Sequence, residues 1–234
     1  MDHATQFPTT QWSMVLDISP ADQTPKGRDA IEHFCRTYWG PLKSFIESLG
    51  VPAPDAEDLT QEVFANIHRL DHYANLNPGK GSMRGFLKTT GRNRVHEFHR
   101  KMARQKRGGK QAHLPLIEQV PLPDPKEPEK QFDRKWALHL LDLTAAEMEH
   151  QYRDRGRHSW FCHLFPIMTK EVTDITYAQA AEKLETTEGA VKLACHRMKD
   201  KYRKVLRAEV AKTILSENEV DEEISCLFNA LSAP

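Results

Sequence analysis

Two neighbouring segments of the chain carry charged side chains at helical spacing, and each could recognise a different partner. The first segment, residues 55–64, is acidic, and the second, residues 85–101, is basic. Side chains three or four positions apart lie on one face of a helix, where like charges repel one another unless a partner neutralises them. The sequence therefore predicts one basic or polar partner and one polyanionic partner.

In the acidic segment, helical spacing separates an apolar stripe from a polar face. The apolar stripe consists of Leu59, Val63, Ile67 and Leu70. The candidate binding residues on the polar face are Asp58, Gln61, Glu62 and Ala65. A helix dipole favours acids in the first turn, which accounts for Asp55 and Glu57 but not for Glu62. The alternative is an acidic face that contacts only solvent.

In the basic segment, positive side chains recur at steps of four along one face. The candidate nucleic-acid-binding residues are Arg84, Lys88, Arg92, Asn93, His96, Arg100 and Lys101. The apolar face is expected to comprise Met83, Leu87, Val95, Phe98 and Met102. Between Arg84 and Lys110 the only acidic residue is Glu97. Phosphates along a nucleic-acid strand would supply the missing counter-charge, whereas the alternative is a solvated basic face.

Residues 175–203 have the pattern of a helix-turn-helix. Thr176 and Gln179 form a capping box at the start of a helix that runs to Leu184, and Thr187 is a plausible N-cap of the next helix. The second helix is expected to bury Val191, Cys195, Met198 and Tyr202. Its candidate DNA-binding residues are Glu188, Gly189, Lys192, His196, Arg197 and Lys199. An ordinary helical hairpin with a solvated basic face is the alternative.

These segments also resemble a known family. The stretches 55–64 and 86–94 resemble region two of bacterial RNA polymerase sigma factors of the sigma-70 family, with the closest likeness to the extracytoplasmic-function (ECF) type. Residues 175–203 are similar to sigma region four. The resemblance implies that the acidic helix binds core RNA polymerase, that the basic helix engages the minus-ten promoter element and that the helix-turn-helix reads the minus-thirty-five element.

Two further features refine the resemblance. The opening residues 9–13, the basic run 105–109 and a C-terminal extension are similar to a longer ECF-like subgroup. Many family members have glycine where this chain has Glu185, a position that is expected to adopt a left-handed backbone. A residue other than glycine costs about 1–2 kcal/mol in that conformation.

The coarse pattern predicts an all-α protein with two small helical domains. We expect a region-two-like domain at residues 1–107, a proline-rich linker at 108–131, a region-four-like domain at 132–212 and a helical extension at 213–234. Helices are expected at residues 29–38, from Pro41 to Leu49 and at 158–168. A helical pattern that begins near Phe132 is expected to bury Trp136.

The C-terminal extension combines acids at its start with an apolar stripe. The stripe consists of Val220, Ile224, Leu227, Phe228 and Leu231. We expect this helix to pack on the region-four-like domain. The alternative is a regulatory contact in which its acids shield the basic DNA-reading face of the free protein, and an anti-sigma factor is a further possible partner.

Composition narrows the remaining possibilities. The chain has 234 residues, 33 Lys and Arg against 33 Asp and Glu, and four cysteines that form no Cys-x-x-Cys pair. We expect reduced thiols, no metal site, no cofactor and, since no apolar run is long enough to span a membrane, a cytoplasmic location without membrane contact. The prediction is a sigma factor rather than an enzyme, because no nucleophile, histidine pair or carboxylate cluster has catalytic spacing. A helix-turn-helix regulator that acts without polymerase is the alternative.

Overall fold

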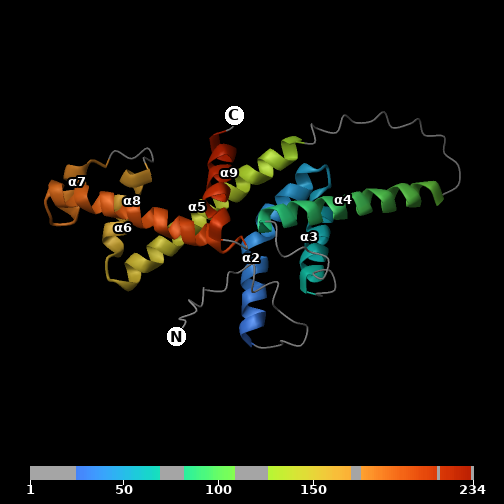
Figure 1. Cartoon of the computed structure of the whole chain (residues 1–234), viewed down its shortest axis with the longest axis horizontal. Helices are drawn as coiled ribbons and strands as arrows, with labels where there is room; N and C mark the ends of the chain where they lie inside the picture. Colours follow the sequence, from blue (N-terminus) through green and yellow to red (C-terminus); the bar gives the residue numbers. More distant parts are fainter. Residues whose placement is uncertain (1–24, 69–81, 109–125, 170–174, 215–216, 233–234) are drawn as a thin grey trace. The chain divides into compact units, whose positions relative to one another are not determined.

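The computed structural model describes residues 25–68, 82–108, 126–169, 175–214 and 217–232. Within these ranges the chain forms helices and no strand, which confirms the all-α class (Figure 1). The α-helices are α2 (Pro25–Ser48), α3 (Ala53–His68), α4 (Met83–Gly108), α5 (Lys126–Asp154), α6 (His158–Thr169), α7 (Tyr177–Lys183), α8 (Glu188–Ala211) and α9 (Val220–Ser232). A short 3-10 helix, η2 (Glu217–Glu219), precedes α9.

The chain divides into two compact units, and the boundary falls inside α5. Among the described residues, the first unit comprises α2, α3, α4, the start of α5 up to Ala137, and the C-terminal segment from Ala211 onwards. The second unit comprises residues 138–210, and it therefore contains α6, α7 and nearly all of α8.

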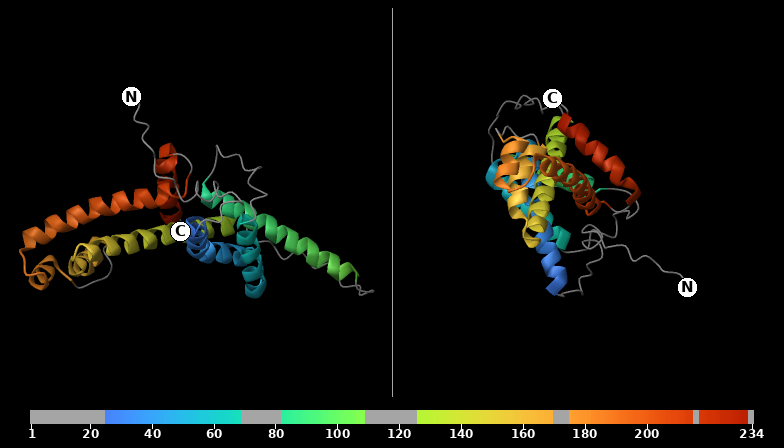
Figure 2. Two further views of the ribbon diagram at one scale, coloured as in Figure 1. Left: turned by 90° about the horizontal axis from the view of Figure 1, so that it is seen from below. Right: turned by 90° about the vertical axis from the view of Figure 1, so that its left-hand side faces the viewer.

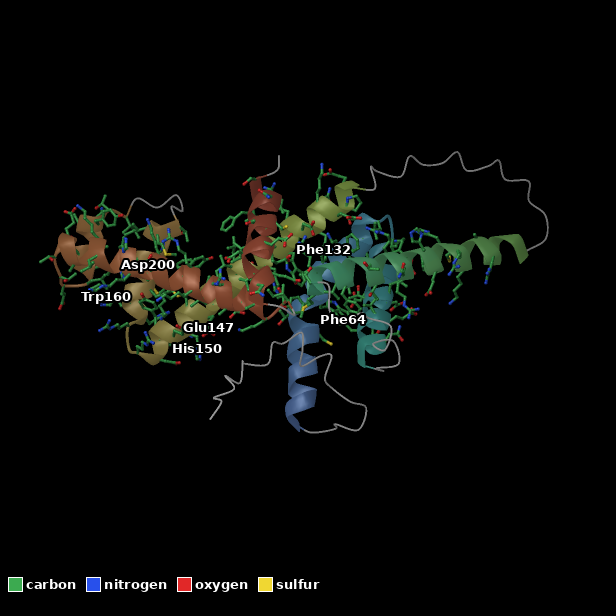
Figure 3. The ribbon with its side chains drawn as sticks, in the orientation of Figure 1. Phe64, Phe132, Glu147, His150, Trp160 and Asp200 are labelled. Carbon is green, nitrogen blue, oxygen red and sulfur yellow. The ribbon has the colours of Figure 1, made fainter. Side chains whose placement is uncertain are left out.

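The core of the first unit is built around aromatic side chains of α2 and α5. Tyr38 stacks on Trp136 with ring centroids 4.8 Å apart, and Phe45 contacts Phe132 at 4.9 Å between centroids. All four side chains are almost fully buried, and Figure 3 labels Phe132 near the start of α5. Pairs of this kind contribute about 0.5–1.5 kcal/mol beyond the burial of their area. The start of α5 therefore belongs to the core of the first unit.

Gly91 allows α4 to approach α2 closely. A Cβ atom at this position would lie 3.1 Å from Cδ1 of Leu42 and 3.3 Å from Cδ1 of Phe45. Glycine inside a helix costs about 0.5–1 kcal/mol relative to alanine. The close contact between the two helices explains why this cost is tolerated, and it fixes the position of the basic helix α4 on the core.

The second unit has its own apolar core, which holds the helix-turn-helix against α5 and α6. Val191, Cys195 and Met198 of α8 are buried there, as the sequence predicts, together with Phe161 and Leu164 of α6. Tyr202 is half-buried and faces Phe165, with ring centroids 6.1 Å apart. Burial of one stripe of α8 leaves the opposite stripe available for contact.

The turn between α7 and α8 matches the sequence prediction closely. The side chain of Thr176 accepts a hydrogen bond from the Gln179 backbone, and the Gln179 side chain accepts one from the Thr176 backbone, which is the predicted capping box. The hydroxyl of Thr187 accepts a hydrogen bond from the Ala190 N–H at 3.2 Å and caps α8. α7 ends at Lys183, one residue before the expected end.

Glu185 adopts the left-handed conformation that the family resemblance implies, with φ of 50°. The N–H of Glu185 donates to the Glu182 carbonyl, and the N–H of Thr186 donates to the Ala181 carbonyl. These two bonds define a Schellman motif, in which glycine usually occupies the left-handed position. The turn after α5 has the same motif, and there Gly156 occupies the left-handed position with φ of 64°. The turn after α5 thus uses glycine at this position, and the turn after α7 uses glutamate.

Several expectations about helix bounds were wrong. α2 continues through Pro41 to Ser48 as one helix instead of two. α5 begins at Lys126, six residues before the expected start at Phe132, because Pro128 is compatible with the first turn of a helix. Trp136 is buried as expected, but in the first unit. The opening motif at residues 9–13 lies outside the described residues.

Some predicted core positions also differ. Leu59, Val63, Met83, Leu87 and Val95 are buried as expected. Met102 is 40% exposed and Phe228 is 52% exposed, so neither belongs to the apolar face that its spacing predicts. The side chains of Ile67 and Leu70, as well as those of residues 105–109, lie outside the described part of the structure.

We predict that Glu185→Gly stabilises the turn by about 1 kcal/mol, because glycine removes the strain of the left-handed conformation. Part of this gain is offset, since glycine loses more conformational entropy on folding than glutamate does. Amide hydrogen exchange across α7 and α8 of the full chain measures the effect. Glu185→Ala is the matched control, since alanine retains the strain. Equal protection in the Gly and Ala variants would contradict the prediction.

Candidate protein and nucleic-acid interfaces

The predicted binding residues of α3 lie together on one exposed face. Asp58, Gln61, Glu62 and Ala65 line an open hollow of about 550 Å³, with Asn66 and with Arg94 of α4. All four predicted residues are exposed, and among the described residues Asp58 and Glu62 have no ion-pair partner. The opposite face of α3 is anchored by buried Leu59 and Val63. The hollow is therefore acidic, accessible and held by a packed helix.

Glu57 behaves differently from the acids of the hollow. Its carboxylate accepts a hydrogen bond from Nζ of Lys43 on α2 at 2.9 Å. This contact raises the pKa of the Lys43 ammonium above its ordinary value, chiefly through the hydrogen bond to Glu57. Glu57 therefore has an ion-pair partner within the protein. Asp58 and Glu62, on the same helix as Glu57, have none among the described residues.

We call the predicted nucleic-acid-binding residues of α4, from Arg84 to Lys101, the basic row. The row divides into two halves, and the first half, which begins at Arg84, forms ion pairs within the protein. The guanidinium of Arg84 donates two hydrogen bonds to the Glu223 carboxylate of α9, at 2.8 and 2.9 Å. It also lies 2.8 Å from Oδ1 of Asp133 on α5. The side chains of Arg84 and Glu223 are only 13% and 9% exposed. One buried arginine therefore ties α4 to both α5 and α9.

Lys88 and Arg92 continue the paired half along α4. Nζ of Lys88 donates to both carboxylate oxygens of Asp133, at 2.8 and 3.1 Å. Arg92 donates to the carboxylate of Glu129 on α5. All three basic residues of this half are thus neutralised by carboxylates of the first unit.

The electrostatic environment keeps Arg84 charged in spite of its burial. Burial acts to lower the pKa of its guanidinium, but the hydrogen bonds and charges of Glu223, followed by those of Asp133, outweigh burial and raise the pKa. A bidentate arginine–carboxylate pair is among the strongest charge-assisted contacts in proteins. Removing one member would leave the other as an uncompensated buried charge.

The second half of the row, residues 93–104, is open. Asn93, His96, Arg100 and Lys101 are exposed, and the described residues offer Arg100 and Lys101 no carboxylate partner. Arg100, Lys101 and Arg104 line a second open hollow with Glu97, whose carboxylate pairs with Arg94 at 2.7 Å. Figure 1 and the left view of Figure 2 show α4 as a single helix that extends past α3. This is the part of α4 that a polyanion can reach in the structure.

On α8, every predicted DNA-binding residue is exposed: Glu188, Gly189, Lys192, His196, Arg197 and Lys199. Lys192 pairs with Glu188 at 2.7 Å, and this hydrogen bond raises the pKa of the Lys192 ammonium. Nδ1 of His196 lies 3.3 Å from the Asp200 carboxylate. Asp200 is labelled on α8 in Figure 3. The exposed stripe is basic overall, and its acids neutralise part of it locally.

The described residues hold no metal cluster, disulfide or helix that could span a membrane. They contain no cluster of three or more histidine, cysteine, aspartate or glutamate side chains that could hold a metal ion. Their cysteines, Cys35, Cys162, Cys195 and Cys226, are unpaired thiols. No described helix is sufficiently long and apolar to cross a membrane.

Sequence reasoning missed the acids that neutralise the first half of the row. Glu129, Asp133 and Glu223 were not among the candidate residues, and the expectation that the C-terminal helix packs on the region-four-like domain was wrong. α9 belongs to the first unit, where Glu223 binds Arg84. The sequence did contain one indication of this contact. As an alternative role, the acids at the start of the C-terminal helix were expected to shield the basic DNA-reading face.

We predict that Arg84→Met destabilises the first unit by about 3–5 kcal/mol, because it leaves Glu223 buried without a partner. The double variant Arg84→Met/Glu223→Leu should recover most of the loss, since apolar side chains of similar size can replace a buried ion pair. Hydrogen exchange of α4 and α9 measures both effects, with the exposed Arg100→Met as control. A double variant as unstable as the single one would contradict this assignment.

Residues 34–105 match the family model of sigma-70 region 2. The matched segment includes most of α2, all of α3 and most of α4, so both hollows lie inside it. No curated protein and no solved structure matches the chain. Residues 34–105 are thus similar to sigma-70 region 2, and the match supports membership of the sigma-70 family and a role in transcription initiation.

Proposed function

We propose that this chain is a sigma factor of the ECF type that binds core RNA polymerase and directs it to promoters with a minus-ten and a minus-thirty-five element. The observation that carries the proposal is the pair of surfaces inside the region 2 match. One is an acidic hollow without internal partners, and the other is a basic row that is open beyond Arg92. A factor that joins a protein to a nucleic acid needs both kinds of surface.

The polymerase-binding face is the hollow of α3. Asp58 and Glu62 are exposed one turn apart and have no ion-pair partner among the described residues, so their mutual repulsion costs about 0.2–0.5 kcal/mol in the free chain. A basic or polar surface of the core polymerase would remove that repulsion. Gln61 and Ala65 complete the contact with an amide and a small side chain.

The open half of α4 contacts the minus-ten element. Asn93, His96, Arg100 and Lys101 are exposed and could bind phosphates and base edges of a separating strand. Bases that become exposed on opening gain these contacts, which favours strand separation without another energy source. The first half of the row, Arg84, Lys88 and Arg92, holds α4 in place through α5 and α9.

The exposed stripe of α8 contacts duplex DNA of the minus-thirty-five element. The second helix of a helix-turn-helix enters the major groove and presents its first residues to base edges. Lys192, His196 and Lys199 supply positive charge to phosphates, which positions the helix without specifying sequence. Capping by Thr187 and the buried stripe of α8 fix its orientation.

The C-terminal helix α9 stabilises the region-two-like domain by packing in the first unit. Among the described residues of the row, Glu223 contacts Arg84 at its start and leaves Arg100 and Lys101 accessible. An autoinhibitory shield would instead have to cover the open half of α4. We therefore assign α9 a structural role and not a regulatory one.

A regulator that binds DNA without polymerase is the competing function. It would use the same basic residues on α8, but it would give the acidic hollow of α3 no partner. The region 2 match and the unpaired acids of that hollow favour the sigma factor.

We predict that Glu62→Lys weakens binding to core RNA polymerase by tenfold or more, about 1.4 kcal/mol, because it reverses the charge of the hollow. Glu57→Lys on the same helix is the matched control, since Glu57 lies outside the hollow and its exposed pair with Lys43 is worth little. Binding of the purified chain to core enzyme is measured by titration. Wild-type affinity of Glu62→Lys would refute the polymerase assignment.

For α9, the near-isosteric Glu223→Gln variant should leave affinity for a single-stranded minus-ten oligonucleotide unchanged, because the open half of α4 is already accessible. The amide oxygen of glutamine can still accept a hydrogen bond from Arg84, and Asp133 still supplies a counter-charge. The holoenzyme is titrated with a fluorescent oligonucleotide. A gain in affinity of about tenfold, equivalent to about 1.4 kcal/mol, would instead make α9 an autoinhibitory helix.

A further inference from the structure

Three residues on the exposed face of α8 have no structural role within the described part of the chain. Gly189, Leu193 and Arg197 are spaced one turn apart and form a single strip, which we call the reading strip. Leu193 is 51% exposed, and the described residues supply Arg197 with no ion-pair partner. By contrast, the neighbouring Lys192 and His196 contact acids of the same helix.

Gly189 is not required by the packing or the backbone of the chain. A Cβ atom at this position would meet nothing within 4 Å, and Gly189 is not among the residues with positive φ. Gly189 is the second residue of α8, so the cost of glycine in the middle of a helix, about 0.5–1 kcal/mol relative to alanine, is an upper limit here. An external surface that approaches the backbone at the start of α8 would account for this cost.

Leu193 is apolar in an otherwise charged surface. A single exposed leucine needs no explanation by itself, but Leu193 follows Gly189 by one turn and precedes Arg197 by one turn. All three lie in the first half of α8, the second helix of the helix-turn-helix. In such modules this part of the helix faces the base edges in the major groove.

The chemistry of the strip matches one kind of surface. In the major groove, thymine presents an apolar C5-methyl group, and guanine presents two acceptors, O6 and N7, that fit the two donors of an arginine. The basic residues around the strip, Lys192, Lys199 and Arg203, are exposed. Lys192 and Arg203 pair with Glu188 and Asp200 of the same helix, but exposed pairs of this kind are weak, so all three can complement the phosphates on either side. The charge of the surrounding surface therefore favours duplex DNA over a protein partner.

We propose that the reading strip sets the sequence preference of the upstream element, with Leu193 against a thymine methyl group and Arg197 bidentate on a guanine. Gly189 allows the backbone of α8 to approach the groove. The proposal rests on the proposed function of α8 in promoter binding. It adds the residues that specify sequence, of which Leu193 was not a candidate at the sequence level.

The helix geometry also gives the spacing of the two bases. Leu193 and Arg197 are separated by one turn, which is about 6 Å along the axis of α8. Base pairs are stacked about 3.4 Å apart. Because α8 lies at an angle to the DNA axis when it enters the groove, the thymine and the guanine should lie no more than about two base pairs apart in the bound duplex.

The experiment starts with selection of duplexes from a random library by the holoenzyme of the full chain with core polymerase. Each thymine of the enriched upstream element is then replaced by deoxyuridine, which removes only the methyl group. At one thymine, this change should weaken binding of the wild type about fourfold, the effect of one buried methyl group. The same change should have no effect on Leu193→Ala, because the two partners of one contact are coupled.

The control for exposed apolar area is Leu138→Ala, since Leu138 is 47% exposed on α5, outside the helix-turn-helix. It should retain the wild-type response to deoxyuridine. Arg197→Gln should lose the preference for guanine at one position, whereas Lys199→Gln should weaken all duplexes alike. If deoxyuridine affects Leu193→Ala and the wild type equally at every position, the reading strip is refuted.

Failure of the proposed function has a different signature. If the holoenzyme enriches no upstream element, and Lys192→Glu leaves duplex affinity unchanged, α8 does not bind DNA and both proposals fail together. If an element is enriched but shows no coupling to Leu193, the promoter-binding role of α8 stands and only the assignment of its reading residues is overturned.

Discussion

The buried ion cluster around Arg84 is the interaction on which the arrangement of the first unit depends. Arg84 joins α4 to Glu223 of α9 and to Asp133 of α5 through contacts of 2.8–2.9 Å. Its two acidic partners come from segments far apart in the sequence, and Glu223 follows Arg84 by 139 positions. The bidentate geometry of an arginine–carboxylate pair fixes the helices in one register.

This cluster also determines which surfaces remain for partners. It occupies the first half of the basic row on α4, so the open half, with Arg100 and Lys101, carries the unneutralised charge of that helix. The acidic hollow on α3 remains equally free. The described residues thus present an acidic surface on α3 and a basic surface on α4, and these are the surfaces that the proposed function assigns to a protein and to a nucleic acid.

Local features were predictable from the sequence, and long-range pairs were not. The capping box at Thr176 and the N-cap at Thr187 each depend on residues within one turn, whereas the left-handed Glu185 was expected from the family resemblance. The exposed positions of Glu62 and Arg100 follow from helical periodicity. Periodicity places Arg84 on the same row as Arg100, however, and it cannot distinguish a paired arginine from a free one. That distinction depends on Glu223, whose position requires the tertiary fold.

The division of the basic row is tested most directly by the salt dependence of binding to a single-stranded minus-ten oligonucleotide. Each phosphate contact contributes about 0.7 to the slope of log affinity against log salt concentration. Arg100→Gln should reduce the slope by about 0.7, whereas the apolar double variant Arg84→Met/Glu223→Leu should leave it unchanged. An equal reduction by the double variant would show that Arg84 binds DNA, and it would contradict the structural role assigned to the buried cluster.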